Sequence, residues 1–376
     1  MQAVRAGRSY RQVARRFRVG VATVALWVHR AQGRALARVQ WRDRTARPRR
    51  VHRTAARLVR LILQIRRQLA RHDALGEHGP AAIRARLLAR GERAPCARTI
   101  ARWLARSGVS GRERWRRPPP PKGWYLPAFA AGRAEVDSVD VVEGVGVHAC
   151  GRFEVLNTLS LLGHLPDSTV ARRITTTVTI NELAVRWRRD GLPHYAQFDN
   201  DTIFSGAHVH RRYFGRLVHW CLCLGVIPVF APPAELGFQA AIEAYNGCWQ
   251  RRVWRRWRHR HCADLQRRSH AFVQAYRDTK GTTQGRLRRP WSEPAAQPRQ
   301  PLVILIRRLD EAGGLTVCAQ RLRIAAHWAH HLVRCEINVR TQKLRCFALA
   351  RRDPQHQPLL ATRPLRVRLV PHHVTA

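Results

Sequence analysis

Lysine is almost absent from this 376-residue chain, which has it only at Lys122, Lys280 and Lys343. Acidic residues are also few, because 24 Asp and Glu stand against 69 Lys and Arg, for a formal charge of +45. So strong an imbalance argues against a basic partner and predicts a polyanionic one, with nucleic acid as the default. A GC-rich genome also favours arginine, so we do not attribute the arginine content wholly to phosphate contacts.

Several common signals are missing as well. The nine cysteines form no CxxC pair, and the histidines show no paired zinc-ligand spacing, so we expect buried free thiols and no structural zinc. No glycine-rich phosphate loop is present, so we expect no ATP and no other small-molecule cofactor. The longest apolar run, residues 220–232, is short and contains Gly225 and Pro228, and we find no signal peptide. We therefore expect no membrane partner and a cytoplasmic protein.

The positive charge is unevenly distributed along the chain. Residues 1–127 hold 32 Arg and Lys against 5 acids, and residues 251–376 hold 27 against 7. Residues 128–250 hold 10 against 12, a net charge of −2. Two DNA-binding flanks around a carboxylate site that binds metal would produce this pattern.

The N-terminal third reads as two helical DNA-binding units. Residues 1–34 predict a helix-turn-helix, with Ser9 as N-cap of a helix over "YRQVARRF" and a second helix over "VATVALWVHRA". Residues 55–110 predict a second such unit with three helices. The last of these helices carries arginines four residues apart, which form either a row of phosphate contacts or a solvated face: Arg98, Arg102 and Arg106.

Arginine- and proline-rich segments separate these units from the rest. We expect a connector at 35–56 and breaks at 115–127 and 281–301. Between the breaks, residues 128–280 alternate strands and helices, which predicts an α/β domain. Residues 301–376 show two-residue alternation and predict a small β-barrel-like domain.

Three carboxylates in the α/β region suggest a metal site. Asp137 lies inside an apolar strand, Asp199 ends the strand "HYAQF", and Glu243 lies on an amphipathic helix. A buried acid is costly unless a cation compensates it, and carboxylate oxygens suit Mg²⁺ or Mn²⁺. A pair of such ions could activate water or a DNA 3′-hydroxyl, so we expect a two-metal site.

The same stretch, about residues 130–260, resembles the catalytic core shared by retroviral integrases and many insertion-sequence transposases. The resemblance rests on four motifs in order: Asp137 on the first strand, "FDN" at 198–200, "LGVIPVFAPP" at 224–233 and "IEAYN" at 242–246. It implies a ribonuclease H-like fold and metal binding by Asp137, Asp199 and Glu243. It also implies terminal inverted repeats and target DNA as partners, and a homo-multimer that joins two DNA ends.

Three further acids are alternatives within this pattern. The interval between Asp199 and Glu243 is longer than the family's usual spacing between its second Asp and its Glu, and Glu235 would make it shorter. Glu235 follows "APPA", however, and has no aromatic-Asn pair after it, so Glu243 is preferred. Asp140 is the alternative first ligand, and because residues three apart on a strand face opposite sides, only one of the two can point at the metals. Asp201 stands where the family usually has glycine and reads as a turn residue or a supporting carboxylate.

Past Glu243, arginine and tryptophan interleave in "WQRRVWRRWRHRHC", where Arg251, Arg252 and Arg255 are candidate phosphate contacts. We therefore predict a transposase or integrase that cleaves DNA and transfers strands. A catalytically inactive, transposase-derived DNA-binding protein is the alternative, and a ribonuclease of the same fold is disfavoured by the helix-turn-helix units.

Overall fold

The structure is a computed structural model, and it describes residues 1–42, 54–109, 123–148, 150–206, 212–235, 237–281 and 287–372. The chain divides into two compact units, Met1–Leu58 and Val59–Ala376. Half of the predicted connector at 35–56 and much of the break at 115–127 lie outside the described residues. No helix among the described residues has both the length and the apolar character needed to cross a membrane.

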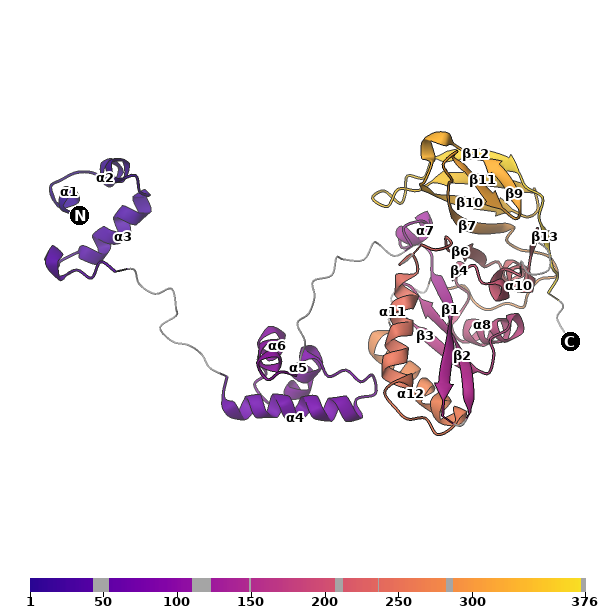
Figure 1. The fold of residues 1–376 in the computed structure, drawn as a ribbon, viewed down its shortest axis with the longest axis horizontal. Coiled ribbons are helices and arrows are strands. Elements are labelled where there is room, and N and C mark those ends of the chain that lie inside the picture. The colour runs from indigo at the N-terminus through magenta and orange to yellow at the C-terminus, as the bar shows by residue number, and fades with distance from the viewer. Residues whose placement is uncertain are drawn as a thin grey trace. The chain divides into compact units, whose positions relative to one another are not determined.

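The first unit contains the predicted helical hairpin (Figure 1). Its helices are α1 (Gln2–Arg5), α2 (Tyr10–Phe17), α3 (Val21–Ala31) and the short η1 (Leu36–Arg38). Ser9 caps α2 as predicted, because its hydroxyl accepts from the Gln12 backbone while the Gln12 side chain accepts from the Ser9 backbone. Arg18 adopts a left-handed conformation and turns the chain toward α3, and a small core joins Val13 to Val24.

Three helices follow at the start of the second unit, also as predicted: α4 (Ala56–His72), α5 (Pro80–Leu88) and α6 (Ala97–Arg106). Pro80 starts α5, where its missing N–H costs nothing. Each helix buries two apolar residues one turn apart, and these form the shared interior of the three helices: Ile62, Ile65, Ile83, Leu87, Ile100 and Leu104.

A mixed nine-stranded sheet forms the largest part of the second unit, with strand order β12-β11-β10-β7-β6-β4-β1-β2-β3. The first five strands along the chain that belong to it are β1 (Val136–Val147), β2 (Gly151–Ser160), β3 (Pro166–Ala171), β4 (Tyr195–Phe198) and β6 (Ile227–Phe230). Neighbours β1, β2 and β3 run antiparallel, whereas β1, β4 and β6 run parallel. In this parallel pairing β4 lies beside the first residues of β1, where Val136–Ser138 pair with Tyr195–Gln197.

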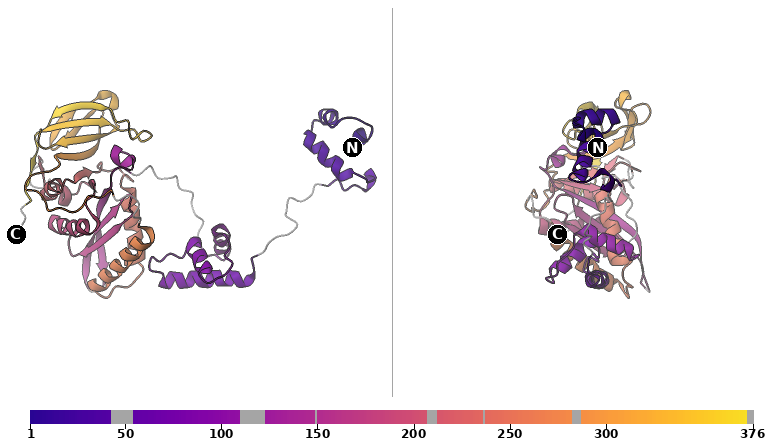
Figure 2. Two further views of the ribbon diagram at one scale, coloured as in Figure 1. Left: turned by 180° about the vertical axis from the view of Figure 1, so that it is seen from behind. Right: turned by 90° about the vertical axis from the view of Figure 1, so that its left-hand side faces the viewer.

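Helices cover both faces of this part of the sheet (Figures 1 and 2). One face packs against α8 (Thr176–Asp190) and α10 (Arg216–Cys223), with Trp187 and Trp220 stacked 5.0 Å apart in its core. The other packs against α11 (Ala240–Trp249) and α12 (Cys262–Lys280), which meet β1, β2 and β3. Short elements complete this region: α7 (Pro127–Ala130), α9 (Thr202–Ser205), β5 (Tyr213–Phe214) and η2 (Gln250–Trp254).

The C-terminal strands continue the central sheet, which corrects the expectation of a separate small β-barrel-like domain. β7 (Leu302–Arg308) pairs in parallel with β6 through Val229–Ile304 and Phe230–Leu305. Alternate residues of β7 enter two different hydrophobic clusters, Val303 in one and Ile304 in the other, so both faces of the strand are buried. A strand buried on both faces has an uninterrupted apolar sequence, here "LVILI", and belongs inside a sheet.

Beyond β7, the chain adds strands on the outer side. β10 (Leu332–Asn338), β11 (Lys343–Ala348) and β12 (Leu359–Pro364) follow β7 by antiparallel pairing. The predicted turn between β10 and β11 is present, and Cys335 and Cys346 lie opposite each other there. The remaining elements are peripheral: β8 (Gly314–Val317), β9 (Gln320–Arg323), η3 (Ala326–Trp328) and β13 (Arg368–Leu369). All nine cysteines are free thiols as expected, but only four are buried, and Cys96 is exposed.

Candidate active site

Asp137 and Asp140 lie on opposite faces of β1. Side chains alternate along a strand, so residues three positions apart point in opposite directions. Asp137 is fully buried on the face covered by α8, where Arg186 donates to both carboxylate oxygens, Nε at 3.0 Å and Nη2 at 3.2 Å. The indole Nε1 of Trp187 donates to the same carboxylate at 2.8 Å.

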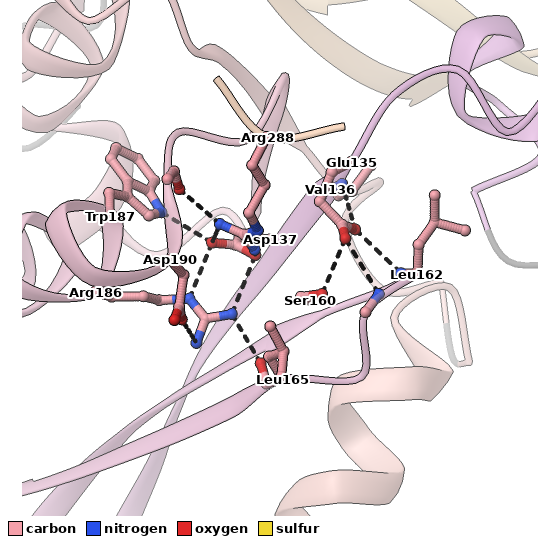
Figure 3. A network of polar contacts seen from close by, with 12 residues as sticks. Glu135, Val136, Asp137, Ser160, Leu162, Leu165, Arg186, Trp187, Asp190 and Arg288 are labelled. Carbon is pink, nitrogen blue, oxygen red and sulfur yellow. Dashed lines mark hydrogen bonds and ion pairs between the residues drawn. The ribbon is translucent and has the colours of Figure 1, made fainter. Parts of the chain in front are cut away.

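Arg288 completes the surroundings of Asp137 (Figure 3). Its guanidinium donates to both Asp137 oxygens and, at 2.9 Å, to the carbonyl of Gly191. Burial by itself would raise the pKa of Asp137, but the charges and hydrogen bonds of Arg186 and Arg288 outweigh burial and hold that pKa well below its usual range. The carboxylate is therefore already compensated by protein cations, which corrects our choice of Asp137 as first metal ligand.

Asp137 and its three partners, Arg186, Trp187 and Arg288, form the Asp137 cluster, which extends to other charged residues. Arg186 also bonds Asp167 at 2.6 Å and the Leu165 carbonyl at 2.8 Å, and Arg277 from α12 bonds Asp190 at 2.6 Å. Near the start of β1, buried Glu135 accepts from backbone N–H groups of the turn after β2 (Figure 3). Charged contacts thus join β1 to β3, α8 and α12, and none of the participating acids remains without a donor.

Asp140, the alternative first ligand, lies beside Asp199. Ser138 pairs with Gln197 in the parallel register of β1 and β4, and two residues further along each strand this register leads to Asp140 and Asp199. Burial, the negative charge of Asp199 and that of Glu243 raise the pKa of Asp140 to about 6. No arginine or lysine among the described residues forms an ion pair with it at 4.0 Å or less. The charges of Asp199 and Glu243 therefore act on Asp140 and not on Asp137.

The aromatic-Asn pair of "IEAYN" explains how α11 is held over this site. Asn246 lies one turn after Glu243, and its Nδ2 donates to Asp140 Oδ2 at 2.5 Å while its Oδ1 accepts from Asn157 at 2.8 Å. Tyr245, on the neighbouring face of the helix, shares a 2.7 Å hydrogen bond with Ser168. These neutral contacts orient the helix and the Asp140 carboxylate without neutralising its charge.

The acids around Asp199 have distinct surroundings. Burial raises the pKa of Asp199, and the negative charges of Asp201 and Glu143 raise it further. A hydrogen bond from the Asp201 backbone N–H acts in the opposite direction and lowers this pKa. Asp201 caps α9 by accepting from Ile203 N at 2.9 Å, as a turn residue does, and its charge also acts on Asp199, as that of a supporting carboxylate would. Glu235, which precedes α11, instead forms an ion pair with Arg308 of β7.

Sequence reasoning missed four residues that shape this region: Asn157, Glu143, Arg186 and Arg288. Asn157 interrupts the apolar run of β2, which is the only sequence signal for its role. Glu143 follows Asp140 by three residues, yet an irregularity between Val142 and Val145 shifts the register there. The two arginines are far from β1 in sequence, and nothing in their local pattern distinguishes them from the chain's other arginines.

The donor set can be compared with the expected metal. Asp140, Asp199 and Glu243 are hard oxygen donors of the type that Mg²⁺ prefers. Across the described ranges, no three His, Cys, Asp or Glu side chains are close enough together to hold an ion as they stand. Glu243 is solvent-exposed in the first turn of α11, so its side chain can turn toward the two aspartates without breaking the core. The residue types fit a divalent cation, and the two aspartates supply the fixed part of the site.

The candidate phosphate contacts divide into two groups. One group is exposed to solvent: Arg98, Arg102 and Arg106 on α6, and Arg251 and Arg255 in the segment after α11. Arg252, in contrast, is half-buried and donates to the carbonyl of Gly76. One N–H of Arg252 thus binds the protein's own backbone, which leaves Arg252 less accessible than the other candidate phosphate contacts.

No family model and no curated protein matches this chain. Among solved structures, it is similar to a chain in the cryo-electron microscopy structure of the simian T-cell lymphotropic virus intasome in complex with PP2A regulatory subunit B56 gamma. The TM-score is 0.34 at 11% identity, covering 67% of this chain and 84% of that chain. A likeness of this degree carries no argument about function, which depends on the site itself.

The Asp137 cluster makes a testable prediction about stability. Asp137→Ala leaves the buried charge of Arg186 without its main partner, so we expect the free energy of unfolding to fall by about 3–5 kcal/mol. Denaturant titration followed by circular dichroism measures this change. As a control, Asp353→Ala at an exposed position should change the free energy by less than about 0.5 kcal/mol. An equally small effect at Asp137 would contradict the structural role of the cluster.

Asp140 should behave in the opposite way. Its folded-state pKa of about 6 lies above the ordinary 3.8, so its contribution to stability is complete below about pH 4 and is lost as pH rises through 6. In metal-free buffer, Asp140→Asn should therefore be more stable than the parent above pH 6, by about 3 kcal/mol. The difference should vanish below pH 4. Unfolding measured at a series of pH values tests this, and a variant less stable than the parent at pH 7 would overturn it.

Proposed function

We propose that this chain is a metal-dependent DNA transposase or integrase with a ribonuclease H-like core and the catalytic carboxylates Asp140, Asp199 and Glu243. The observation that carries the proposal is the register of β1 and β4, which leads from the Ser138–Gln197 pair to Asp140 and Asp199. Glu243, from the "IEAYN" motif, is close enough for its charge to act on Asp140. A divalent metal site requires neighbouring acids whose charge no protein cation compensates. The chain's charge of +45 in turn suits a polyanionic substrate.

The strand order supports the proposed fold class. Three antiparallel strands, β3-β2-β1, continue into the parallel strands β4 and β6, with helices on both faces. We propose that the core of the enzyme is residues 128–280, whose five strands are extended by the C-terminal strands to the nine-stranded sheet.

In this proposal, two Mg²⁺ or Mn²⁺ ions would be held by Asp140, Asp199 and Glu243, and when bound they would supply a nucleophile and stabilise the leaving oxygen. The chain's own residues prepare the site. Asn246 fixes the orientation of one Asp140 oxygen, and Asn157 fixes Asn246 in turn. The Asp201 backbone N–H, 2.9 Å from Asp199 Oδ1, restrains the second carboxylate.

DNA is the proposed partner, with terminal repeats bound by the helical units at residues 1–34 and 55–110 and target DNA at the carboxylates. The exposed arginines of α6 would contact phosphates there, and Arg251 and Arg255 would do so beside α11. Because two DNA ends must be joined, we propose a homo-multimer on DNA.

One observation favours a second candidate, a catalytically inactive DNA-binding protein derived from a transposase. In the described part of the chain the three carboxylates do not yet approach to metal-binding distance, and "FDND" replaces the family's usual glycine with Asp201. The two candidates differ in whether any divalent cation supports strand cleavage.

The experiment that separates them is a strand-cleavage and strand-transfer assay with Mg²⁺ or Mn²⁺ on the DNA ends that flank the gene. We expect activity in the parent and at least a hundredfold loss in Asp140→Asn, Asp199→Asn and Glu243→Gln, since each removes a charged ligand. Glu235→Gln is the matched control, because that glutamate pairs with Arg308 and should retain activity. Absence of activity in the parent with either cation would favour the inactive candidate.

The DNA-binding arginines can be tested by salt dependence. Replacing Arg98, Arg102 and Arg106 together with alanine should weaken DNA binding and reduce the slope of log affinity against log salt by about 3, one unit per lost phosphate contact. Fluorescence anisotropy at several salt concentrations measures the slope. An unchanged slope would show that these side chains form a solvated face only.

A further inference from the structure

A cavity of about 570 Å³ lies between the sheet and the first turns of α11. Its lining includes Ser138 of β1, Gln197 of β4 and Ala244 of α11. Ser138 and Gln197 are register partners, and each lies two residues before a proposed catalytic aspartate on its own strand. At a rise of about 3.3 Å per residue, the polar groups of the cavity are about 7 Å along the strands from Asp140 and Asp199.

Two of these lining residues have polar atoms without partners. Ser138 Oγ and Gln197 Nε2 are buried, with each residue 1% exposed, and neither atom forms a hydrogen bond within the described structure. The Gln197 amide also interacts with the hydroxyl of Tyr125, which opposes the rise that burial causes in the pKa of that hydroxyl. Buried polar groups are normally paired, and an unpaired one destabilises the protein. A ligand that presents hydrogen-bond acceptors to this part of the cavity would satisfy both.

The remaining walls are aromatic and apolar. Tyr125 and Phe238 stack with ring centroids 4.4 Å apart, and Trp124, Tyr245 and Tyr276 also line the space. The described lining contains one arginine, Arg351, whose guanidinium lies over the Trp124 ring, 5.2 Å from the centroid. A phosphate or a carboxylate would therefore meet little positive charge inside, whereas a flat ring with polar edge atoms suits both the walls and the unpaired groups.

We propose that this cavity holds a single unstacked nucleobase, from the DNA strand whose phosphate lies at Asp140, Asp199 and Glu243. The inference rests on the proposed function, because it takes DNA as the substrate. Ser138 and Gln197 would bind acceptors on the base edge, and the aromatic walls would replace its stacking in the duplex. A base next to the reacting phosphate would fix the strand in register with the carboxylates.

The test compares two DNA probes that differ only in bases. One is a 20-base-pair duplex with a three-nucleotide thymidine 3′ overhang, and the other has the same overhang made of abasic nucleotides. Binding is measured by fluorescence anisotropy in Mg²⁺, with the full chain carrying Glu243→Gln to prevent cleavage. We expect the probe with bases to bind about tenfold more tightly, the size of effect typical of stacking one base.

Two variants then address the cavity. Gln197→Ala removes a base contact, and Ala244→Trp fills the cavity from an exposed position of α11. Both should reduce the ratio of the two affinities toward one while binding to the abasic probe is unchanged. The matched control is Ala312→Trp, at an exposed position outside the cavity lining, which should keep the tenfold ratio. Thermal unfolding of each variant verifies that it is folded.

Three outcomes would overturn the inference: equal affinity for the two probes in the parent, an unchanged ratio in both cavity variants, or an equal loss of affinity for both probes. Strand transfer that depends on Glu243 without base preference would leave the proposed function standing and reject only the nucleobase site. Base preference without any cleavage by the enzyme with Glu243 intact would support the nucleobase site and reject the catalytic proposal.

Discussion

The buried ion pair between Asp137 and Arg186 constrains the rest of the core. Both side chains are almost completely buried, so a shift that separated them would leave uncompensated charge inside the protein. Arg186 comes from α8, and Arg288 reaches the same carboxylate from the segment before β7. Because a slip of one residue would reverse every side chain of β1, this pair also determines which face of the strand presents Asp140.

The candidate site follows from that orientation. Asp137 and Asp140, three residues apart, have opposite pKa shifts, lowered by arginines at one and raised by burial and neighbouring acids at the other. Such divergence separates a carboxylate used for structure from one available for chemistry. The groups that hold Asp140, Asn246 and the backbone of Val141, are neutral hydrogen-bond donors, and this leaves its charge available to a cation.

The C-terminal strands also support the site. Arg307 of β7 donates to Asn200 Oδ1 at 2.8 Å and to the Ala231 carbonyl at 3.2 Å, and Asn200 itself donates to Ala231 at 2.6 Å. These bonds join the loop after Asp199 to the loop that leads to Glu243. Burial lowers the pKa of Arg307. The strands after residue 301 are therefore part of the framework that positions the carboxylates.

Much of this could be predicted from the sequence, because it depends on local pattern. Ser9 and Pro80 identified helix starts, and the alternation of strands and helices after residue 128 predicted the α/β region. The motifs singled out Asp199 and Glu243, and strand periodicity required that only one of Asp137 and Asp140 could face them. Which of the two does so was decided by the tertiary structure alone. The reason is that Arg186 and Arg288, 49 and 151 residues from Asp137 along the chain, compensate its charge only once α8 and the segment before β7 have packed against β1.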